Sequence, residues 1–500
     1  MRKLYVLIVI GWLVIYNHNQ VKANNVRCVM QTPAVEIGFQ TNFIAPDLQI
    51  KRLTAVLVKD SILFTLVYSS QKDRLLAFFN PPEGDVIKYI DRTGIKKADT
   101  LSTFYIAKNQ FQSVVSITMR FSTNEDSEKD RNFIFLDILE PSVKNLLGIN
   151  KDAKYAASNP QPRRTNITSF KKYQDVRWCN LTAIEDTLTY EKISKLTYNK
   201  DSKFGKHTTE AEEIIEQGKN PGLGIRAIHK QGITGKGITI AIIDQNLPGK
   251  HPEYKGKIAK YKDVGCKQPE NSGSMHGPGV LSLLVGETIG TAPDAKIYFA
   301  AAPSWTRDAK YEADALNWVI EENRLLPKGD KIRVVSCSGA PSGPGSPFTK
   351  NNSNWDEAVK TAEQEGIIVL DCTKDHGFIG PCYYDRNNPE DVKQCKVGWP
   401  DRPVKDSSVF STTKIFAPCS NRTVAEEYNE GTNSYQYCGK AGLSWSIPYV
   451  AGVMAMGWQI KPNISGTDMV RILLKTATTN FQGYKIVDPV KFINELQQIR

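Results

Sequence analysis

Between residues 237 and 372 the chain alternates short apolar runs with amphipathic segments, and this alternation limits what it can fold into. The apolar runs are 237–243 (GITIAII), 296–301 (KIYFAA), 332–337 (IRVVSC) and 366–372 (GIIVLDC). Largely continuous apolar runs are typical of strands that are buried on both faces. Helices predicted between them, such as 308–326 and 355–365, would cover those faces. We therefore expect an α/β fold with a parallel sheet and helices on both faces, in a domain over 207–500.

The part of the chain before residue 207 has a different pattern. Runs rich in β-branched residues, such as 53–68 (LTAVLVKDSILFTLVY) and 133–139 (FIFLDIL), are separated by turn residues. This pattern predicts a β-rich N-terminal domain over 24–150. Residues 151–206 are polar, basic and poor in large apolar side chains. We expect them to form a basic connector with some weak helix.

The first 23 residues resemble an export signal in their composition. Arg2 and Lys3 precede an apolar run over 4–16, and Val21 and Ala23 place small residues before a cut after residue 23. This arrangement predicts a cleaved signal peptide over 1–23 and a secreted, extracellular protein. The alternative is a single membrane anchor, although the apolar run is short for a bilayer span.

Composition excludes several classes of protein. The 500 residues are 40% hydrophobic and 23% charged, which is typical of a globular chain and excludes a mostly disordered one. No later apolar run is long enough to span a bilayer, which excludes a multi-pass membrane protein. Cleavage would remove three basic residues and no acid, so the net charge would fall from +11 to +8. This modest excess, without zinc-finger or aromatic-basic repeats, gives no reason to expect a nucleic-acid partner.

Nine cysteines follow the predicted signal, and an exported chain can form disulfides. An odd number leaves at least one thiol unpaired or bound to another chain. Cys382 with Cys395, and Cys419 with Cys438, are plausible pairs that would staple loops. Connectivity does not follow from the sequence. Since there is no CxxC motif and the chain has only six histidines, we expect no structural zinc site, and we expect no cofactor.

Three reactive residues occupy positions where a parallel sheet would bring them together. Asp244 directly follows the predicted strand 237–243, His276 begins an apolar helix, and Ser444 precedes another. Parallel sheets bind ligands at the carboxyl ends of their strands. A serine hydroxyl becomes a nucleophile when an imidazole accepts its proton and a carboxylate orients that imidazole. The order Asp, His, Ser is the one found in subtilisin.

Five blocks of residues in the same order resemble motifs of the subtilisin-like serine proteases, over about 220–477. Residues 235–244 are similar to the family's GKGV…VLDTG, and 276–280 (HGPGV) to HGTHVAG. Residues 442–452 (GLSWSIPYVAG) are similar to GTSMAAPHVAG. The two shorter blocks are 251–254 (HPEY), similar to HPDL, and 290–295 (GTAPDA), similar to GVAPxA.

The resemblance implies a function for particular residues. Asp244 would be the triad acid, His276 the base and Ser444 the nucleophile. Ser338 and Gly339, in a segment similar to the family's substrate-binding edge, would pair with the backbone of a protein or peptide substrate. Such an edge with a glycine leaves room for an extended peptide. The family's oxyanion-hole asparagine aligns with Asp375, which could donate a hydrogen bond only when it is protonated.

Other positions depart from the family's motifs. Gly279 replaces the second histidine of HGTHVAG, Trp445 replaces the methionine after the nucleophile, and Tyr449 replaces the histidine of PHVAG. The segment 286–289 leaves no room for the family's calcium loop, so we expect no metal there.

Two functions follow from these observations. The first is a secreted serine endopeptidase that forms an acyl-enzyme intermediate through Asp244, His276 and Ser444. The second is a catalytically impaired pseudoprotease that acts as a binding or regulatory module, for which Asp375 and the altered motifs argue. The region before residue 207 could be a propeptide that inhibits the same chain or a permanent accessory domain. The sequence leaves the oligomeric state open.

Overall fold

The computed structural model describes residues 166–247, 251–266, 275–374, 377–403, 414–427 and 434–499, and the backbone of nine strands before residue 139. The predicted signal peptide, Cys28, Asp375 and His376 lie outside the described residues. The chain divides into two compact units, one over Met1–Ala77 and Lys88–Asn150 and the other over Phe78–Ile87 and Lys151–Arg500.

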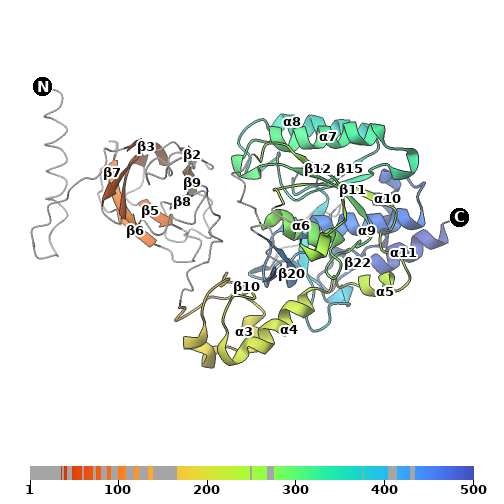
Figure 1. Ribbon diagram of the computed structural model, residues 1–500, viewed down its shortest axis with the longest axis horizontal. Coiled ribbons are helices and arrows are strands. Elements are labelled where there is room, and N and C mark those ends of the chain that lie inside the picture. The colour runs from red at the N-terminus through yellow and green to blue at the C-terminus, as the bar shows by residue number, and fades with distance from the viewer. Residues whose placement is uncertain are drawn as a thin grey trace, which may run out of the picture. The chain divides into compact units, whose positions relative to one another are not determined.

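The first unit is built from β-strands, as the sequence predicts. One sheet has the order β1-β3-β4-β7 and another the order β2-β9-β8-β5-β6 (Figure 1). Strands β3 and β4 are the longest and pair antiparallel from Leu48↔Ser70 to Val58↔Ser61. The strands are β1 Val35–Glu36, β2 Phe39–Thr41, β3 Leu48–Val58, β4 Ser61–Ser70, β5 Leu75–Phe79, β6 Ile87–Asp91, β7 Thr100–Ala107, β8 Ile117–Ser122 and β9 Phe133–Ile138.

A five-stranded parallel sheet forms the centre of the second unit, which confirms the predicted α/β class. Its order is β12-β13-β11-β14-β15, and every pairing within it is parallel. The four strands expected from the apolar runs are all present. The strands are β11 Thr239–Asp244, β12 Ile258–Asp263, β13 Lys296–Ala301, β14 Val334–Cys337 and β15 Ile368–Leu370.

Strand β12 was not expected from the sequence. Its segment, IAKYKD, lies at the edge of the sheet and is exposed at nearly every position. An edge strand has one solvated side, so it does not need the continuous apolar run that marks its neighbours. Lys260 and Lys262 on this edge are the kind of residues that discourage pairing with another chain.

Alternate residues of the central strand β11 face different cores. Ile240 and Ile242 belong to the cluster formed with helices α6 and α9, whereas Ala241 and Ile243 belong to the cluster formed with α7 and α8. Because side chains alternate along a strand, a run that is apolar at every position is buried on both faces. Figure 1 shows α7 and α8 on one side of the sheet and α6 and α9 on the other. These helices are α6 His276–Val285, α7 Lys310–Leu325, α8 Asn352–Gln364 and α9 Ser446–Ile460.

Smaller sheets and helices surround this core. A six-stranded sheet has the order β18-β17-β16-β19-β23-β22, and a three-stranded sheet the order β10-β21-β20. The strands are β10 Thr197–Asn199, β16 Ile379–Tyr383, β17 Lys396–Trp399, β18 Arg402–Pro403, β19 Ile415–Pro418, β20 Arg422–Glu426, β21 Ser434–Cys438, β22 Thr478–Thr479 and β23 Lys485–Ile486. The remaining α-helices are α3 Tyr190–Ile193, α4 Thr208–Gly218, α5 Ile225–His229, α10 Gly466–Thr476 and α11 Pro489–Gln498. None of the helices in the described residues is long and apolar enough to cross a membrane.

The described part of the predicted basic connector, residues 166–206, packs closely against the residues that follow it. Strand β10 pairs antiparallel with β21. Ile193, Leu196 and Tyr198 are fully buried in one cluster with Ile214 of α4 and Tyr437 of β21. The apolar side chains of this segment are few, but the fold places them on a common surface. The domain boundaries themselves stay predictions.

The cysteines predicted to form loop-stapling pairs are free thiols in the structure. Cys382 and Cys395 are buried and close enough to share a hydrogen bond. Cys419 instead shares a hydrogen bond with Ser420, and Cys438 accepts one from Gln436 at 3.2 Å. Neither disulfide is therefore confirmed.

We expect Leu196→Ala to lower the free energy of unfolding by about 2–5 kcal/mol, since it removes a fully buried side chain from a packed cluster. Urea unfolding of the full chain measures the change. Exposed Lys200→Ala is the matched control and should stay within about 0.5 kcal/mol of wild type. Equal stabilities of the two variants would show that this segment is only loosely attached.

Candidate active site

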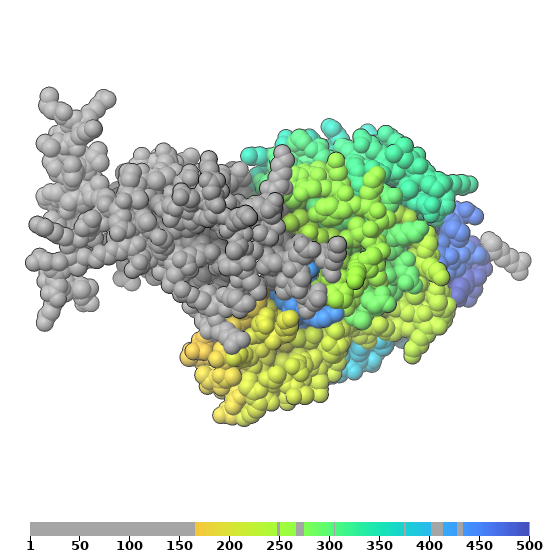
Figure 2. Space-filling view, in the orientation of Figure 1, coloured from red at the N-terminus to blue at the C-terminus, as the bar shows by residue number. Residues whose placement is uncertain are grey.

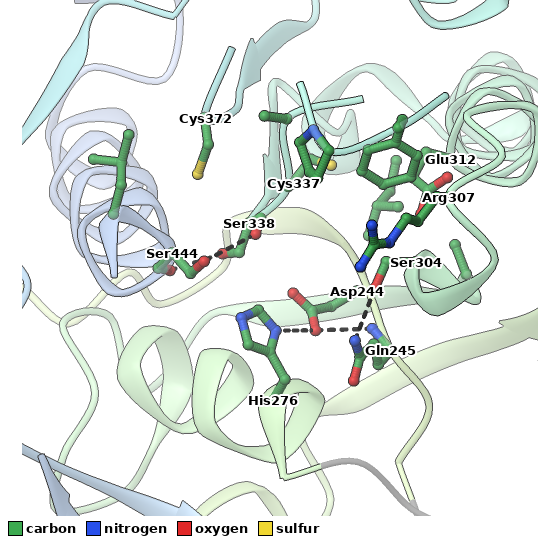
Figure 3. A pocket seen from close by; sticks show the side chains of 17 residues that line it. Asp244, Gln245, His276, Ser304, Arg307, Glu312, Cys337, Ser338, Cys372 and Ser444 are labelled. Atoms are coloured by element: carbon green, nitrogen blue, oxygen red, sulfur yellow. Dashed lines mark hydrogen bonds and ion pairs between the residues drawn. The ribbon is translucent and has the colours of Figure 1, made fainter. Parts of the chain in front are cut away.

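A pocket of about 320 Å³ lies at the carboxyl ends of β11 and β14, where a parallel sheet is expected to bind ligands. Figure 3 shows the side chains that line it. The structure brings together five of the six residues predicted to form the site, and the sixth, Asp375, lies outside the described residues. The five are Asp244, His276, Ser338, Gly339 and Ser444.

Asp244 is the last residue of β11, and its side chain is buried at the edge of the pocket. Its Oδ1 accepts a hydrogen bond from the Nδ1 of His276 at 2.7 Å and another from the backbone N–H of Gln245 at 2.8 Å. Strand β11 is fixed by neighbours on both sides, so the carboxylate has little freedom to move.

His276 is the first residue of α6, and its side chain is partly exposed to the pocket. Burial alone would lower the pKa of its imidazole, but the charge of Asp244 and the hydrogen bond to it raise the pKa above the usual 6.5. The bond also fixes the proton on Nδ1, which leaves Nε2 as the proton acceptor of the neutral ring. A carboxylate–imidazole pair of this kind can therefore accept a proton from a nearby hydroxyl.

The residue after His276 has to be glycine for α6 to begin here. A Cβ on Gly277 would lie 2.3 Å from the backbone oxygen of Gln245, which is closer than any real contact. The start of α6 therefore approaches the backbone that follows Asp244, and this approach brings the imidazole to the carboxylate. Pro278 is tolerated because the first N–H groups of a helix have no partner within it.

Ser444 lies in a 3-10 turn, Leu443–Trp445, that leads into α9. Its hydroxyl donates to the backbone oxygen of Ser338 at 3.0 Å, and the hydroxyl of Ser338 donates to the backbone oxygen of Ser444 at 2.8 Å. These reciprocal bonds join the end of β14 to the turn before α9. Because a hydroxyl carries one proton, Ser444 must rotate away from Ser338 before it can donate to His276.

Two departures from the family's motifs meet in space. The Trp445 ring lies 5.2 Å from the His276 ring, centroid to centroid. A Cβ on Gly279 would lie 3.5 Å from the outer edge of the same indole, in van der Waals contact. The large residue after Ser444 thus fills the space that a larger residue at position 279 would need. The third departure, Tyr449, is fully buried, and its hydroxyl donates to the backbone oxygen of Gly222 at 3.4 Å.

Two cysteines also line the pocket, close to Ser444 and Ser338. Cys337 ends β14, and the backbone N–H of Cys372 donates to Gly339 at 2.8 Å. Burial raises the pKa of both thiols, and a hydrogen bond with the Ser444 side chain opposes this effect for Cys372. Both cysteines are therefore neutral near pH 7.

The sequence interpretation missed several side chains of the pocket, including Ser304, Arg307 and Glu312. Glu312 had a detectable signal: it belongs to the buried stripe of α7 with Leu316, Val319 and Ile320. An acid at helical spacing within an apolar stripe is unusual enough to indicate a special environment. Among the described residues no group of three or more His, Cys, Asp or Glu side chains could hold a metal ion.

Comparison with known proteins identifies a family for about half of the chain. The sequence model of the subtilase family matches residues 235–489. Subtilisin NAT of Bacillus subtilis subsp. natto is 25% identical over 263 residues, which are 50% of this chain and 63% of that protein. Subtilisin of Bacillus pumilus is 24% identical over 263 residues, or 50% of this chain and 88% of that protein.

The solved structure of fervidolysin from Fervidobacterium pennivorans, described as a keratinolytic enzyme related to subtilisin, is also similar. It has 18% sequence identity and a TM-score of 0.40, and the match covers 54% of this chain and 45% of that chain. The chain spans 63% of the length of Subtilisin NAT, so the other residues of Subtilisin NAT have no counterpart in the comparison. Since the family model covers just over half of the 500 residues, the chain belongs to the subtilase family.

Proposed function

We propose that the protein is a secreted serine endopeptidase that hydrolyses peptide bonds of protein or peptide substrates. The observation that carries the proposal is the 2.7 Å hydrogen bond between Asp244 and His276 in the pocket that Ser444 also lines. The family's curated relatives named above are subtilisins, which supports the same reaction class. The pseudoprotease alternative rests on the departures from the family's motifs alone, and the comparisons do not support it.

In this proposal the reaction proceeds by acyl transfer. A substrate peptide lies extended along Ser338 and Gly339. Its arrival displaces the Ser444 hydroxyl from the Ser338 carbonyl, and His276 accepts the hydroxyl proton while Ser444 Oγ attacks the scissile carbonyl. Asp244 stabilises the imidazolium, which then protonates the leaving amine. Water, activated by the same imidazole, releases the acyl group.

Two further assignments rest on the sequence alone. We propose that residues 1–23 direct export and that the β-rich region before residue 151 acts as a propeptide or an accessory domain. We also propose that a protonated Asp375 donates a hydrogen bond to the developing oxyanion, together with backbone N–H groups near the start of α9.

We expect a fluorophosphonate probe to label the folded wild-type protein and to leave Ser444→Ala unlabelled, since the probe reacts with an activated serine hydroxyl. Labelling is detected by mass spectrometry of the intact chain. Ser446→Ala, at the first residue of α9, is the matched control and should still be labelled. Persistent labelling of Ser444→Ala would exclude this nucleophile, and no labelling of folded wild type would favour the pseudoprotease.

The labelling rate should rise with pH through an apparent pKa above 6.5, because the base must be neutral and Asp244 raises the pKa of His276. Asp244→Asn removes the charge that causes this rise, so the apparent pKa should fall. The maximal rate should also fall, by about a thousand- to ten-thousand-fold, because the imidazole loses its orientation. An unchanged midpoint in the variant would show that Asp244 does not act on the base.

Asp375→Asn tests the proposed oxyanion donor. A carboxyl that must be protonated stops donating as the pH rises past its own pKa, so kcat in the wild type should fall on the alkaline side. An asparagine amide donates at every pH, so the variant should lose that fall. An identical alkaline profile in both proteins would exclude Asp375 from this function.

A further inference from the structure

One acidic side chain of the pocket has no part in the chemistry proposed above. Glu312, in the first turn of α7, is only 3% exposed and lines the pocket with Asp244 and His276. Its Oε2 is buried and has no hydrogen-bond partner. Figure 3 shows Glu312 on the side of the pocket away from Ser444. A buried polar atom without a partner costs free energy, so its presence beside a cavity needs an explanation.

A structural function at the start of α7 explains only part of this arrangement. The carboxyl accepts a hydrogen bond from its own backbone N–H, which satisfies one of the free donors in the first turn of the helix. That bond uses one position on the carboxyl and leaves Oε2 unpaired. Glutamine would accept the same bond without the cost of burying an acid, so helix capping alone does not account for a glutamate here.

The surroundings of Glu312 favour a cation as the missing partner. Burial raises the pKa of its carboxyl to about 8, and the charges of Asp244 and Asp308 act in the same direction. These two carboxylates create a negative potential at this end of the pocket. Arg307 also lines the pocket, but it does not hydrogen-bond to Oε2. An ammonium or guanidinium group entering the pocket would supply the absent donor and favour the ionised carboxylate.

We propose that Glu312 selects substrates by pairing with a basic side chain, lysine or arginine, of the bound peptide. This inference rests on the proposed endopeptidase function, because the peptide must lie along Ser338 and Gly339 for one of its side chains to reach Glu312. The pocket of about 320 Å³ is large enough for one such side chain. Glu312 is thus a specificity residue and takes no part in bond cleavage.

The test uses pairs of peptides that differ at a single position, where one carries arginine and the other its neutral isostere, citrulline. Each position on either side of the scissile bond is varied in this way, one at a time. We expect arginine to be preferred at one position by about ten- to a hundred-fold in kcat/KM, the strength of a charged hydrogen bond. In Glu312→Gln the preference should fall to about one. In Glu321→Gln, an exposed acid on the same helix, it should stay as in wild type.

The pH dependence of the same ratio, compared between wild type and Glu312→Gln, gives a second readout. Below about pH 8 the Glu312 carboxyl is protonated in the free protein, so the arginine preference should grow from about pH 6 to pH 9. Asp244, His276, Asp308, Cys337, Cys372 and Arg307 also lie near this part of the pocket, and a change in their charge acts on the arginine peptide more than on the citrulline peptide. Glu312→Gln keeps all of these groups, so only the part of the pH dependence that this variant loses is assigned to Glu312. A preference that is absent at every position, or that persists in Glu312→Gln, would overturn the proposal.

Failure of the enzyme function would look different. If folded wild type is neither labelled by the fluorophosphonate nor able to cleave any peptide, the proposed function fails. Glu312 is then tested by fluorescence anisotropy, which measures how tightly the arginine and citrulline peptides bind. Two proteins are compared, the Ser444→Ala variant and the double variant that carries Ser444→Ala and Glu312→Gln. Tighter binding of arginine that depends on Glu312 would support a cation site. Equal binding would overturn it.

Discussion

The pocket depends on the pairing of β11 with β14, because it brings Asp244 and Ser338, which are 94 positions apart, to one edge of a sheet. Ile243 of β11 lies opposite Cys337 of β14. The next residues along the two strands, Asp244 and Ser338, therefore emerge side by side at the carboxyl end. Helices α6 and α9 pack on the face of β11 that carries Ile240 and Ile242, so they deliver His276 and Ser444 to the same edge.

The contacts within the pocket show how each reactive group is held. A hydrogen bond to Asp244 orients His276, and a reciprocal pair of bonds to Ser338 holds the turn of Ser444. The Ser444 hydroxyl donates its hydrogen bond to the backbone carbonyl of Ser338, which belongs to the segment that we propose as the substrate-binding edge. A peptide that pairs with this edge would compete for that carbonyl, so substrate binding and release of the hydroxyl are coupled in the proposed reaction.

The sequence predicts the elements best where burial leaves a periodic signal. Strand β13 agrees at both ends with the predicted run 296–301, because its apolar side chains face two cores. The polar edge strand β12 and the packed segment from 166 to 206 carry no such signal, since their apolar residues are few and meet partners far along the chain. Asp244, His276 and Ser444 were predicted from their positions after a strand or at the start of a helix. Ser338 and Gly339 were predicted only from the resemblance to a family. The contact between Gly279 and Trp445 could not be predicted in this way. The two residues are 166 positions apart, and each one taken alone is only a departure from a family motif.

Two carboxyl groups of the same pocket have different hydrogen-bond partners, and this difference agrees with the different functions that we propose for them. Asp244 accepts hydrogen bonds from His276 and from a backbone N–H. Glu312 lacks a partner for Oε2 and lies near Asp244, so burial and repulsion favour its neutral form. A carboxyl group poised in this way becomes charged when a cationic partner arrives. In the proposed function, Asp244 therefore serves the reaction and Glu312 serves substrate recognition, because the two carboxyl groups have different environments in one pocket.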